Sequence, residues 1–261
     1  MKTDSKLHFP DASAASATGL AAIAPRSRAV VVLARSPRAE ARAKGLKGAE
    51  ALFALGRDRA LEAASAVHGA QLVIVGSPGP QAPPTPSALR LPQRGRSFRE
   101  RLENALLDTH RLGFETVVVV GLDAPGLTAG DLDDAFTTLK RQKVVLGPAQ
   151  DGGVYLLGLR GSPDTWRPWI RSVRWQTRHV QEDWQRLVPE ATRLRRELVD
   201  VDAAADLQQV SASAPQDVVL KWVLAALRRP APQPLPRSSA TVFLSFLSAS
   251  SLSRRGPPLA A

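Results

Sequence analysis

TVVVVGLDAPGL, residues 116–127, is the stretch that decides the expected fold. Its four consecutive valines are typical of a strand that is covered on both faces, as in the parallel sheets of α/β proteins. Gly121 allows the chain a tight exit from that strand, Asp123 follows, and Pro125 fixes the loop. A lone carboxylate at the carboxyl end of a strand is well placed to hold Mg²⁺ or Mn²⁺ against a diphosphate. A carboxylate that only caps the turn fits the same residues equally well.

The rest of the chain alternates between short apolar runs and helical patterns. Apolar runs predict further strands at 29–34, 71–76, 143–147 and 154–159. Apolar spacing predicts helices at 48–67, 97–113, 128–141, 177–188 and 215–229, and a turn leading into a short helix at 196–210. This alternation predicts an α/β domain of three layers with a mainly parallel sheet. Such sheets bind ligands at the carboxyl ends of their strands, here the loops 35–46, 77–97, 122–128 and 147–153.

Composition limits the classes of protein to consider. The 261 residues contain no cysteine, which excludes disulfides and thiolate metal sites and makes the cytoplasm the default compartment. The apolar runs are too short to cross a membrane. We expect a mobile leader at 1–28, one domain at 29–229 and a disordered Pro/Ser-rich tail at 230–261.

The formal net charge of +11 suggests an anionic partner. Nucleic acid is disfavoured as that partner, because the basic residues are scattered and aromatic residues make up only 5% of the chain. A phosphorylated small ligand fits the charge as well. Arg35, Arg38, Arg42 and Lys44 in the loop 35–46 could clamp phosphate, although a solvated basic loop explains them too.

GPAQDGGVYLLGL, residues 147–159, carries the second acidic loop. Asp151 stands before Gly152 and Gly153, at the mouth of the last predicted strand. Glycines here favour either a turn with positive φ angles or a close approach of the backbone to a ligand. The loops of Asp123 and Asp151 are both expected at the same edge of the sheet, which favours a shared site.

These segments, in this order, resemble a bacterial family of transferases, the transferase-1 family associated with radical-SAM/selenodomain clusters, one branch of which is named for arsenosugar biosynthesis. The resemblance covers about residues 29–210. Two motifs carry it: Gly-x-Asp-x-Pro-x-Leu, and about twenty-five residues later Gly-Pro-Ala-x-Asp-Gly-Gly-x-Tyr. The segments that match are LARSPRAEARAKGL, QRGRSFRERL, VVVVGLDAPGLTAGDLDDAFTTL, VVLGPAQDGGVYLLGL, IRSVRWQT and VDVDAAADL.

The resemblance implies a fold like that of the GT-A glycosyltransferases and the molybdenum-cofactor guanylyltransferases, a three-layer α/β/α sandwich. It implies transfer of a sugar from a nucleotide-sugar donor to a small-molecule acceptor, assisted by Mg²⁺ or Mn²⁺ on Asp123, with Asp151 at the acceptor. Asp200 and Asp202 match a terminal Asp-x-Asp segment and would either add a metal ligand or cap the short helix. Substrate-binding positions would be Arg35, Arg38, Lys44, Gln93, Gly152, Gly153, Tyr155 and Trp175.

The first basic loop departs from the family pattern. Arg35 replaces the family's first lysine, Glu40 stands where a glycine is usual, and Lys44 is displaced by one position from the second lysine. Two other functions therefore remain open on the same fold. One is nucleotidyl transfer, and the other is nucleotide binding without catalysis.

Overall fold

Strand β4 (Thr116–Val120) lies in the middle of the sheet, between β1 (Arg28–Ala34) and β6 (Val154–Arg160). Its valines are at most 5% exposed. Val118 and Val120 pack into the core on one face of the sheet, and Val117 and Val119 pack into the core on the other. Successive side chains of a strand point to opposite faces, so the valine run fills both layers.

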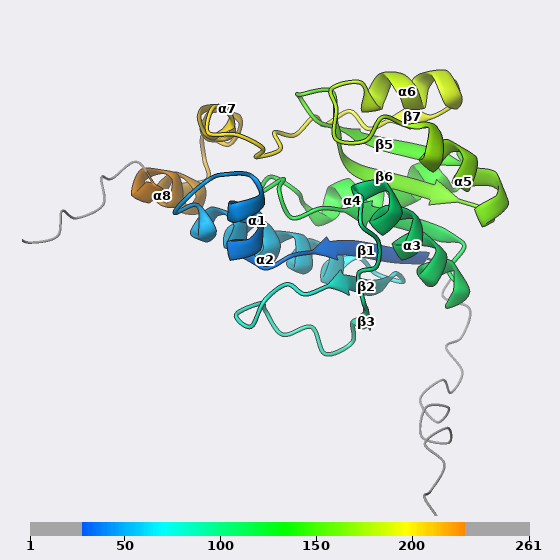
Figure 1. Cartoon of the computed structure of the whole chain (residues 1–261), viewed down its shortest axis with the longest axis horizontal. Helices are drawn as coiled ribbons and strands as arrows, with labels where there is room; N and C mark the ends of the chain where they lie inside the picture. The colour runs from blue at the N-terminus through cyan, green and yellow to red at the C-terminus, as the bar shows by residue number, and fades with distance from the viewer. Residues whose placement is uncertain (1–27, 228–261) are drawn as a thin grey trace, which may run out of the picture.

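The structure is a computed structural model, and it describes residues 28–227. Its sheet of seven strands has the order β3-β2-β1-β4-β6-β5-β7 (Figure 1). The remaining strands are β2 (Gln71–Gly76), β3 (Leu89–Leu91), β5 (Val144–Pro148) and β7 (Thr192–Arg193). Strand β6 runs antiparallel to β4 and β5, and every other pair is parallel. This confirms the predicted α/β fold with a mainly parallel, mixed sheet.

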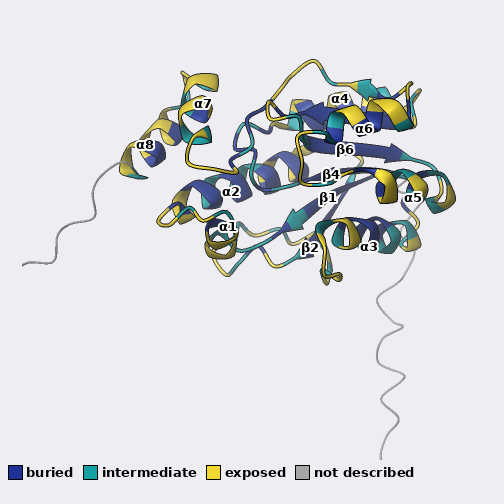
Figure 2. Ribbon diagram, turned by 45° about the horizontal axis from the view of Figure 1, so that its top comes forward, coloured by how far each residue is buried: buried dark blue, intermediate teal, exposed yellow. Residues whose placement is uncertain are grey.

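Helices cover both faces of the sheet (Figure 1). One face packs against α2 (Glu50–Ala66) and α4 (Ala129–Leu139). The other face packs against α3 (Phe98–Arg111), α5 (Pro163–Ser172) and α6 (Val180–Leu187). A smaller core joins one end of α2 to α1 (Pro37–Ala43), α7 (Asp206–Ser213) and α8 (Val218–Leu227). In Figure 2 the central strands are dark with burial, whereas α7 and α8 expose much of their surface.

Most of the predicted elements are present, and their ends have local causes. Ser97 and Glu100 form a capping box at the start of α3, and Thr128 and Asp131 form one at the start of α4. Gly113 follows α3 with φ +92°, a value that glycine adopts at little cost. The expected leader at 1–28 and tail at 230–261 lie outside the described residues, apart from Arg28.

Four elements were not predicted. Residues 35–46, expected to be a loop, contain α1, because Ser36 accepts a hydrogen bond from the Ala39 amide as N-cap and Pro37 starts the helix. Helix α5 also begins with a proline, Pro163, although the side chain of its N-cap residue makes no capping hydrogen bond, and it holds a second proline, Pro168. The edge strands β3 and β7 are 3 and 2 residues long, too short to leave a pattern.

The turn interpretation of the Asp-Gly-Gly segment is correct, because residues 149–153 join the antiparallel strands β5 and β6. Antiparallel pairing starts β6 at the edge where β1 and β4 end. A turn and a site at that edge are therefore compatible. Among residues 28–227, no helix is both long enough and apolar enough to cross a membrane.

Candidate active site

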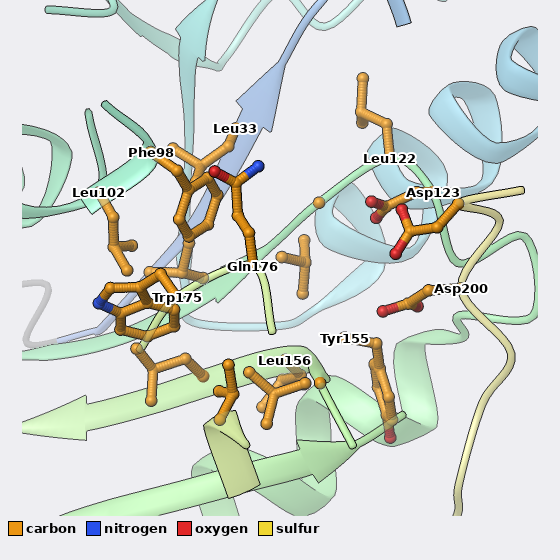
Figure 3. A pocket seen from close by; sticks show the side chains of 18 of the residues that line it. Leu33, Phe98, Leu102, Leu122, Asp123, Tyr155, Leu156, Trp175, Gln176 and Asp200 are labelled. Carbon is orange, nitrogen blue, oxygen red and sulfur yellow. The ribbon is translucent and has the colours of Figure 1, made fainter. Parts of the chain in front are cut away.

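A cavity of about 610 Å³ lies where β1 and β4 end and β6 begins (Figure 3). That volume is in the range of small-molecule sites. The predicted site residues that line it come from every expected loop: Arg35, Lys44, Gln93, Asp123, Asp151, Gly153, Tyr155 and Trp175. Segments that lie far apart in sequence thus meet at the predicted edge of the sheet.

Arg38 and Gly152 were predicted to contact substrate, and they do not line this cavity. Arg38 is exposed on α1, which turns its side chain to solvent. Gly152 has φ +90°, and a Cβ added to it would lie 2.2 Å from the carbonyl oxygen of Arg178. The positive φ and this close approach to the chain itself already require a glycine at 152.

Lys44 holds two of the acidic residues together. Its Nζ donates to Oδ2 of Asp123 at 2.8 Å, to Oδ1 of Asp202 at 2.6 Å and to the carbonyl oxygen of Val201 at 2.7 Å. These contacts use all the donors of an ammonium group. Burial opposes the charge, but the two carboxylates outweigh it and raise the pKa of Lys44. Lys44 therefore remains a cation inside the site.

Asp200 is the most strongly perturbed carboxyl group of the cavity. Burial raises its pKa well above the ordinary value, and the charges of Asp123 and Asp151 raise it further. Its Oδ1 is buried and has no hydrogen-bond partner. Neither Asp200 nor Asp202 caps the short helix, because Asp206 accepts from the amides of Asp202 and Ala203 instead. Strongly perturbed groups in a cleft mark functional sites more often than other positions.

Two arginines, Arg35 and Arg101, also line the cavity. Arg35 follows β1 and forms a long ion pair, 3.7 Å, with Glu40. Arg101 comes from α3, and burial followed by the charge of Arg35 lowers the pKa of its guanidinium. Within the described part of the chain Arg101 has no ion pair, and its Nη1 donates to the carbonyl oxygen of Arg96 at 3.1 Å. Arg101 was not predicted as a site residue, and its place one turn into the capped helix α3 is the signal that the sequence offers.

Asp151 keeps one oxygen available. Its Oδ1 accepts from the amide of Gly153 at 2.8 Å, which fixes the side chain within the turn. No other group of the described residues donates to it. Tyr155 lines the cavity as well, and its hydroxyl donates to the carbonyl oxygen of Arg196 at 3.3 Å. The ring of Tyr155 thus forms part of the wall.

The remaining wall is apolar. Phe98, Leu33 and Leu102 gather there with Trp175, whose ring centroid is 5.6 Å from that of Phe98 (Figure 3). Gln176 follows with φ 60°. Among residues 28–227 it is the one non-glycine residue with a positive φ. Backbone strain of this kind is often kept at functional sites. Figure 3 shows the Gln176 amide beside this apolar wall.

The arrangement does not offer a preformed site for the expected divalent cation. Among residues 28–227, no three His, Cys, Asp or Glu side chains are grouped so that they could hold a metal ion. Oδ2 of Asp123, the residue expected to bind the metal, accepts from Lys44 at 2.8 Å. Carboxylate oxygens are suitable ligands for Mg²⁺ or Mn²⁺. In this structure, however, Asp123 and Asp202 accept hydrogen bonds from Lys44.

Comparison with known proteins places these features in context. Residues 60–177 match the model of a family described as an uncharacterized protein conserved in bacteria (DUF2064). That match includes Asp123, Asp151 and Trp175 but not Lys44 or Asp200. The more specific resemblance to the radical-SAM-associated family stays a prediction.

Two of the similar proteins have transferase names. A protein of Sphaerobacter thermophilus named phosphoenolpyruvate guanylyltransferase is 27% identical over 162 residues, which is 60% of this chain and 78% of that protein. A crystal structure from Desulfovibrio desulfuricans G20, of a candidate nucleotide-diphospho-sugar transferase, has a TM-score of 0.62 at 21% identity, covering 77% of this chain and 96% of that one. A manganese complex of Rv0371C from Mycobacterium tuberculosis H37Rv has a TM-score of 0.44 at 15% identity, covering 71% and 98%. The Desulfovibrio structure shows that the two chains share a fold.

Proposed function

We propose that this chain is a transferase that uses a nucleotide-activated donor, and that its reaction is transfer of a glycosyl group to a small-molecule acceptor. One observation carries the proposal. One cavity is lined both by two arginines, Arg35 and Arg101, and by a carboxylate with an available oxygen, Asp151. These are the groups that a reaction needs when it releases a diphosphate and activates a hydroxyl.

Arg35 and Arg101 are proposed to bind the phosphates of the donor. Guanidinium groups bind phosphate through two parallel hydrogen bonds and stay charged when partly buried. Arg101 has no competing ion pair among the described residues, and Arg35 has only the long contact with Glu40. As the bond between the sugar carbon and the diphosphate oxygen breaks, negative charge develops on the leaving group, and these cations stabilise it.

Asp151 is proposed to accept the proton of the attacking hydroxyl. The acceptor oxygen forms its bond to the sugar carbon, the nucleoside diphosphate leaves with the bonding electrons, and the proton passes to Asp151. The hydrogen bond from the Gly153 amide leaves Oδ2 of Asp151 available for this task. The apolar wall of Phe98 and Trp175 would hold an apolar part of the acceptor.

A second function is favoured by one comparison. The Sphaerobacter relative is named as a guanylyltransferase. In nucleotidyl transfer, an oxygen of the substrate attacks the α-phosphorus of a nucleoside triphosphate and pyrophosphate leaves. The same arginines would bind the triphosphate, so the cavity alone supports both reactions.

The leaving group separates the two reactions. The full chain is incubated with nucleotide sugars or with nucleoside triphosphates, with and without Mn²⁺, and with a small-molecule cell extract as the source of acceptor. Release of nucleoside diphosphate from a nucleotide sugar, lowered at least about 100-fold by Asp151→Asn, is the expected result. Release of pyrophosphate instead would establish nucleotidyl transfer. Tight nucleotide binding with neither product would leave binding without catalysis.

A further inference from the structure

Glu40 lines the same cavity as Arg35 and Arg101. It belongs to α1, in which its amide donates to the carbonyl oxygen of Ser36 at 3.0 Å. Its own carbonyl oxygen accepts from the amide of Lys44 at 3.1 Å. The side chain is only 16% exposed. Helix α1 therefore holds the backbone of Glu40 and presents its carboxylate to the cavity.

The protein holds this carboxylate only weakly. Oε2 of Glu40 lies 3.7 Å from Nη1 of Arg35, which is longer than a hydrogen bond. Within the described part of the chain, no donor forms a hydrogen bond with the Glu40 carboxylate. Glu103 differs, because it accepts from Nε of Arg167 at 2.9 Å and from Nη2 of Arg171 at 2.7 Å. A glutamate that fixes arginines for the fold has contacts like those of Glu103, and Glu40 lacks them.

The charge of Glu40 nevertheless acts on its neighbours in the cavity. Burial raises the pKa of its carboxyl group, and the charge of Asp123 raises it further, whereas the charges of Lys44 and Arg35 lower it. In turn, Glu40 raises the pKa of Arg101, which burial and the charge of Arg35 lower. Glu40 therefore interacts electrostatically with both guanidinium groups, although it forms a short ion pair with neither.

A phosphate bound by these guanidinium groups would meet the charge of Glu40. A phosphate oxygen lies about 2.8 Å from the guanidinium nitrogen that binds it. Oε2 of Glu40 lies 3.7 Å from Nη1 of Arg35, so the two anions would share one cation. Like charges at this range repel, and the repulsion grows with the charge of the ligand. Placing a like charge against an unwanted ligand is one way in which a site becomes specific.

We propose that Glu40 is a specificity-determining residue, whose charge opposes highly charged ligands at Arg35 and Arg101 and so favours a nucleotide sugar over a nucleoside triphosphate. In a nucleotide sugar both phosphates are esterified, which limits the charge that meets Glu40. A triphosphate ends in a free phosphate group and carries more negative charge. This inference rests on the proposed function, because it concerns the donor that the two arginines would bind.

Calorimetric titration of the full chain with GDP-glucose, GDP and GTP tests the proposal, because the base stays the same while the negative charge rises in this order. The titrations are made without divalent cations at about pH 8, well above the ordinary pKa of a glutamate. Glu40→Gln removes the charge with little change of shape. It is expected to raise the affinity for GTP at least about 10-fold and that for GDP-glucose less than about 3-fold. The corresponding uridine nucleotides are titrated in parallel, so that the result does not depend on the base.

Two further variants separate the local charge from shape and from net charge. Glu40→Asp keeps the carboxylate and is expected to retain the order of affinities of the wild type. Glu62→Gln removes the same charge from an exposed position of α2 outside the cavity, and is expected to leave the ratio of GTP to GDP-glucose affinity unchanged. The same ratio in Glu40→Gln as in the wild type would overturn this inference and leave the proposed function standing.

The wild type provides a second test, in case Glu40→Gln does not fold. It is expected to bind GTP no more tightly than GDP-glucose, because Glu40 opposes the additional charge. Binding of GTP by the wild type at least about 10-fold more tightly than GDP-glucose would contradict the inference. If neither the wild type nor Glu40→Gln binds any of these nucleotides, the proposed function fails together with it.

Discussion

Asp200 shows at the scale of one residue how this site and the stability of the fold oppose each other. Its carboxyl group is buried beside two other carboxylates, and one oxygen has no partner. Asp206, only six residues away, accepts from two backbone amides and supports the start of α7. The burial of Asp200 destabilises the fold, whereas the hydrogen bonds accepted by Asp206 stabilise it.

Asp200→Asn is therefore expected to raise the melting temperature at pH 7 by a few degrees, because asparagine avoids the free-energy cost of either burying the charge or protonating the carboxyl group at that pH. Asp206→Asn is the matched control and is expected to lower the melting temperature, since its oxygens bind backbone amides. Thermal unfolding of both variants checks this pair. A lower melting temperature in Asp200→Asn would show that its carboxylate is stabilised in a way that the described contacts do not provide.

A second prediction at the scale of one residue concerns Gly152, with Gly113 as its control. Gly113→Ala is expected to cost about 1–2 kcal/mol, because φ +92° is unfavourable for alanine while no atom lies within 4 Å of the new methyl group. Gly152→Ala has nearly the same φ, +90°, and also places the methyl group 2.2 Å from the carbonyl oxygen of Arg178. We expect it to cost about 2 kcal/mol more than Gly113→Ala. Urea denaturation measures the difference, and equal costs would exclude the contact.

Site residues could be predicted from the sequence where they lie next to the end of a predicted strand. Asp123 and Asp151 were placed in the cavity because each lies beside a strand end at one edge of the sheet. Lys44 was named, but its partners were not, since Asp123 and Asp202 are 79 and 158 residues away. Arg101 was missed because its helix also has a solvent face, and the sequence does not show which arginine faces the cavity.

At the scale of elements, the segment between α5 and α6 determines the shape of the apolar wall. Asp183 of α6 is fully buried and accepts from the backbone amide and the guanidinium of Arg174. Trp175 follows, with its Nε1 donating to the carbonyl oxygen of Ile170 at 2.7 Å. The strained residue Gln176 comes next, so one buried carboxylate holds the start of the wall in place.

Asp183→Asn is expected to lower the free energy of unfolding by on the order of 2 kcal/mol at pH 7, because it breaks a pair with one fully buried partner. The hydrogen bonds from Arg174 lower the pKa of Asp183 from 3.8 to about 2. A carboxyl group with a lowered pKa stabilises the fold above its unfolded value, so the difference between wild type and variant should shrink as the pH falls from about 4 to about 2.

The neighbouring variant Glu182→Gln serves as the control for Asp183→Asn. Glu182 is 69% exposed and lies 3.6 Å from the same arginine. Exposed ion pairs contribute little, so a change below about 0.5 kcal/mol is expected. Denaturation of the wild type and both variants over this range of pH measures the free energies of unfolding. A difference between wild type and Asp183→Asn that stays constant at all pH values would count against the ion pair.

Elements were predictable where their pattern was long. The valine run predicted that β4 lies inside the sheet, because a strand of this sequence must be covered on both faces. Helix α1 was not predicted because it is rich in charged residues and lacks a clear apolar pattern. Ser36 and Pro37 start it, and apart from Pro37 its apolar residues are alanines. The order of strands β6 and β5 depends on long-range pairing, and local periodicity carries no information about it.

At the scale of the molecule, two cores hold the sheet and a third attaches α1, α7 and α8 to one end of α2. The cavity lies at the edge where these units meet: Lys44 follows α1, Asp202 precedes α7, and Asp123 follows β4. The formal net charge of +11 favours association with the phosphorylated ligand that we propose for this cavity.

The most direct test of the central claim is calorimetric titration of the full chain with the nucleoside diphosphate or nucleotide sugar that gives the largest thermal shift. Arg35→Ala is expected to weaken its affinity at least about 10-fold, because it removes a phosphate-binding guanidinium from the cavity. Arg38→Ala removes the same charge from the exposed side of α1 and is expected to leave the affinity unchanged. Absence of nucleotide binding by the wild type, or equal losses in the two variants, would contradict the account.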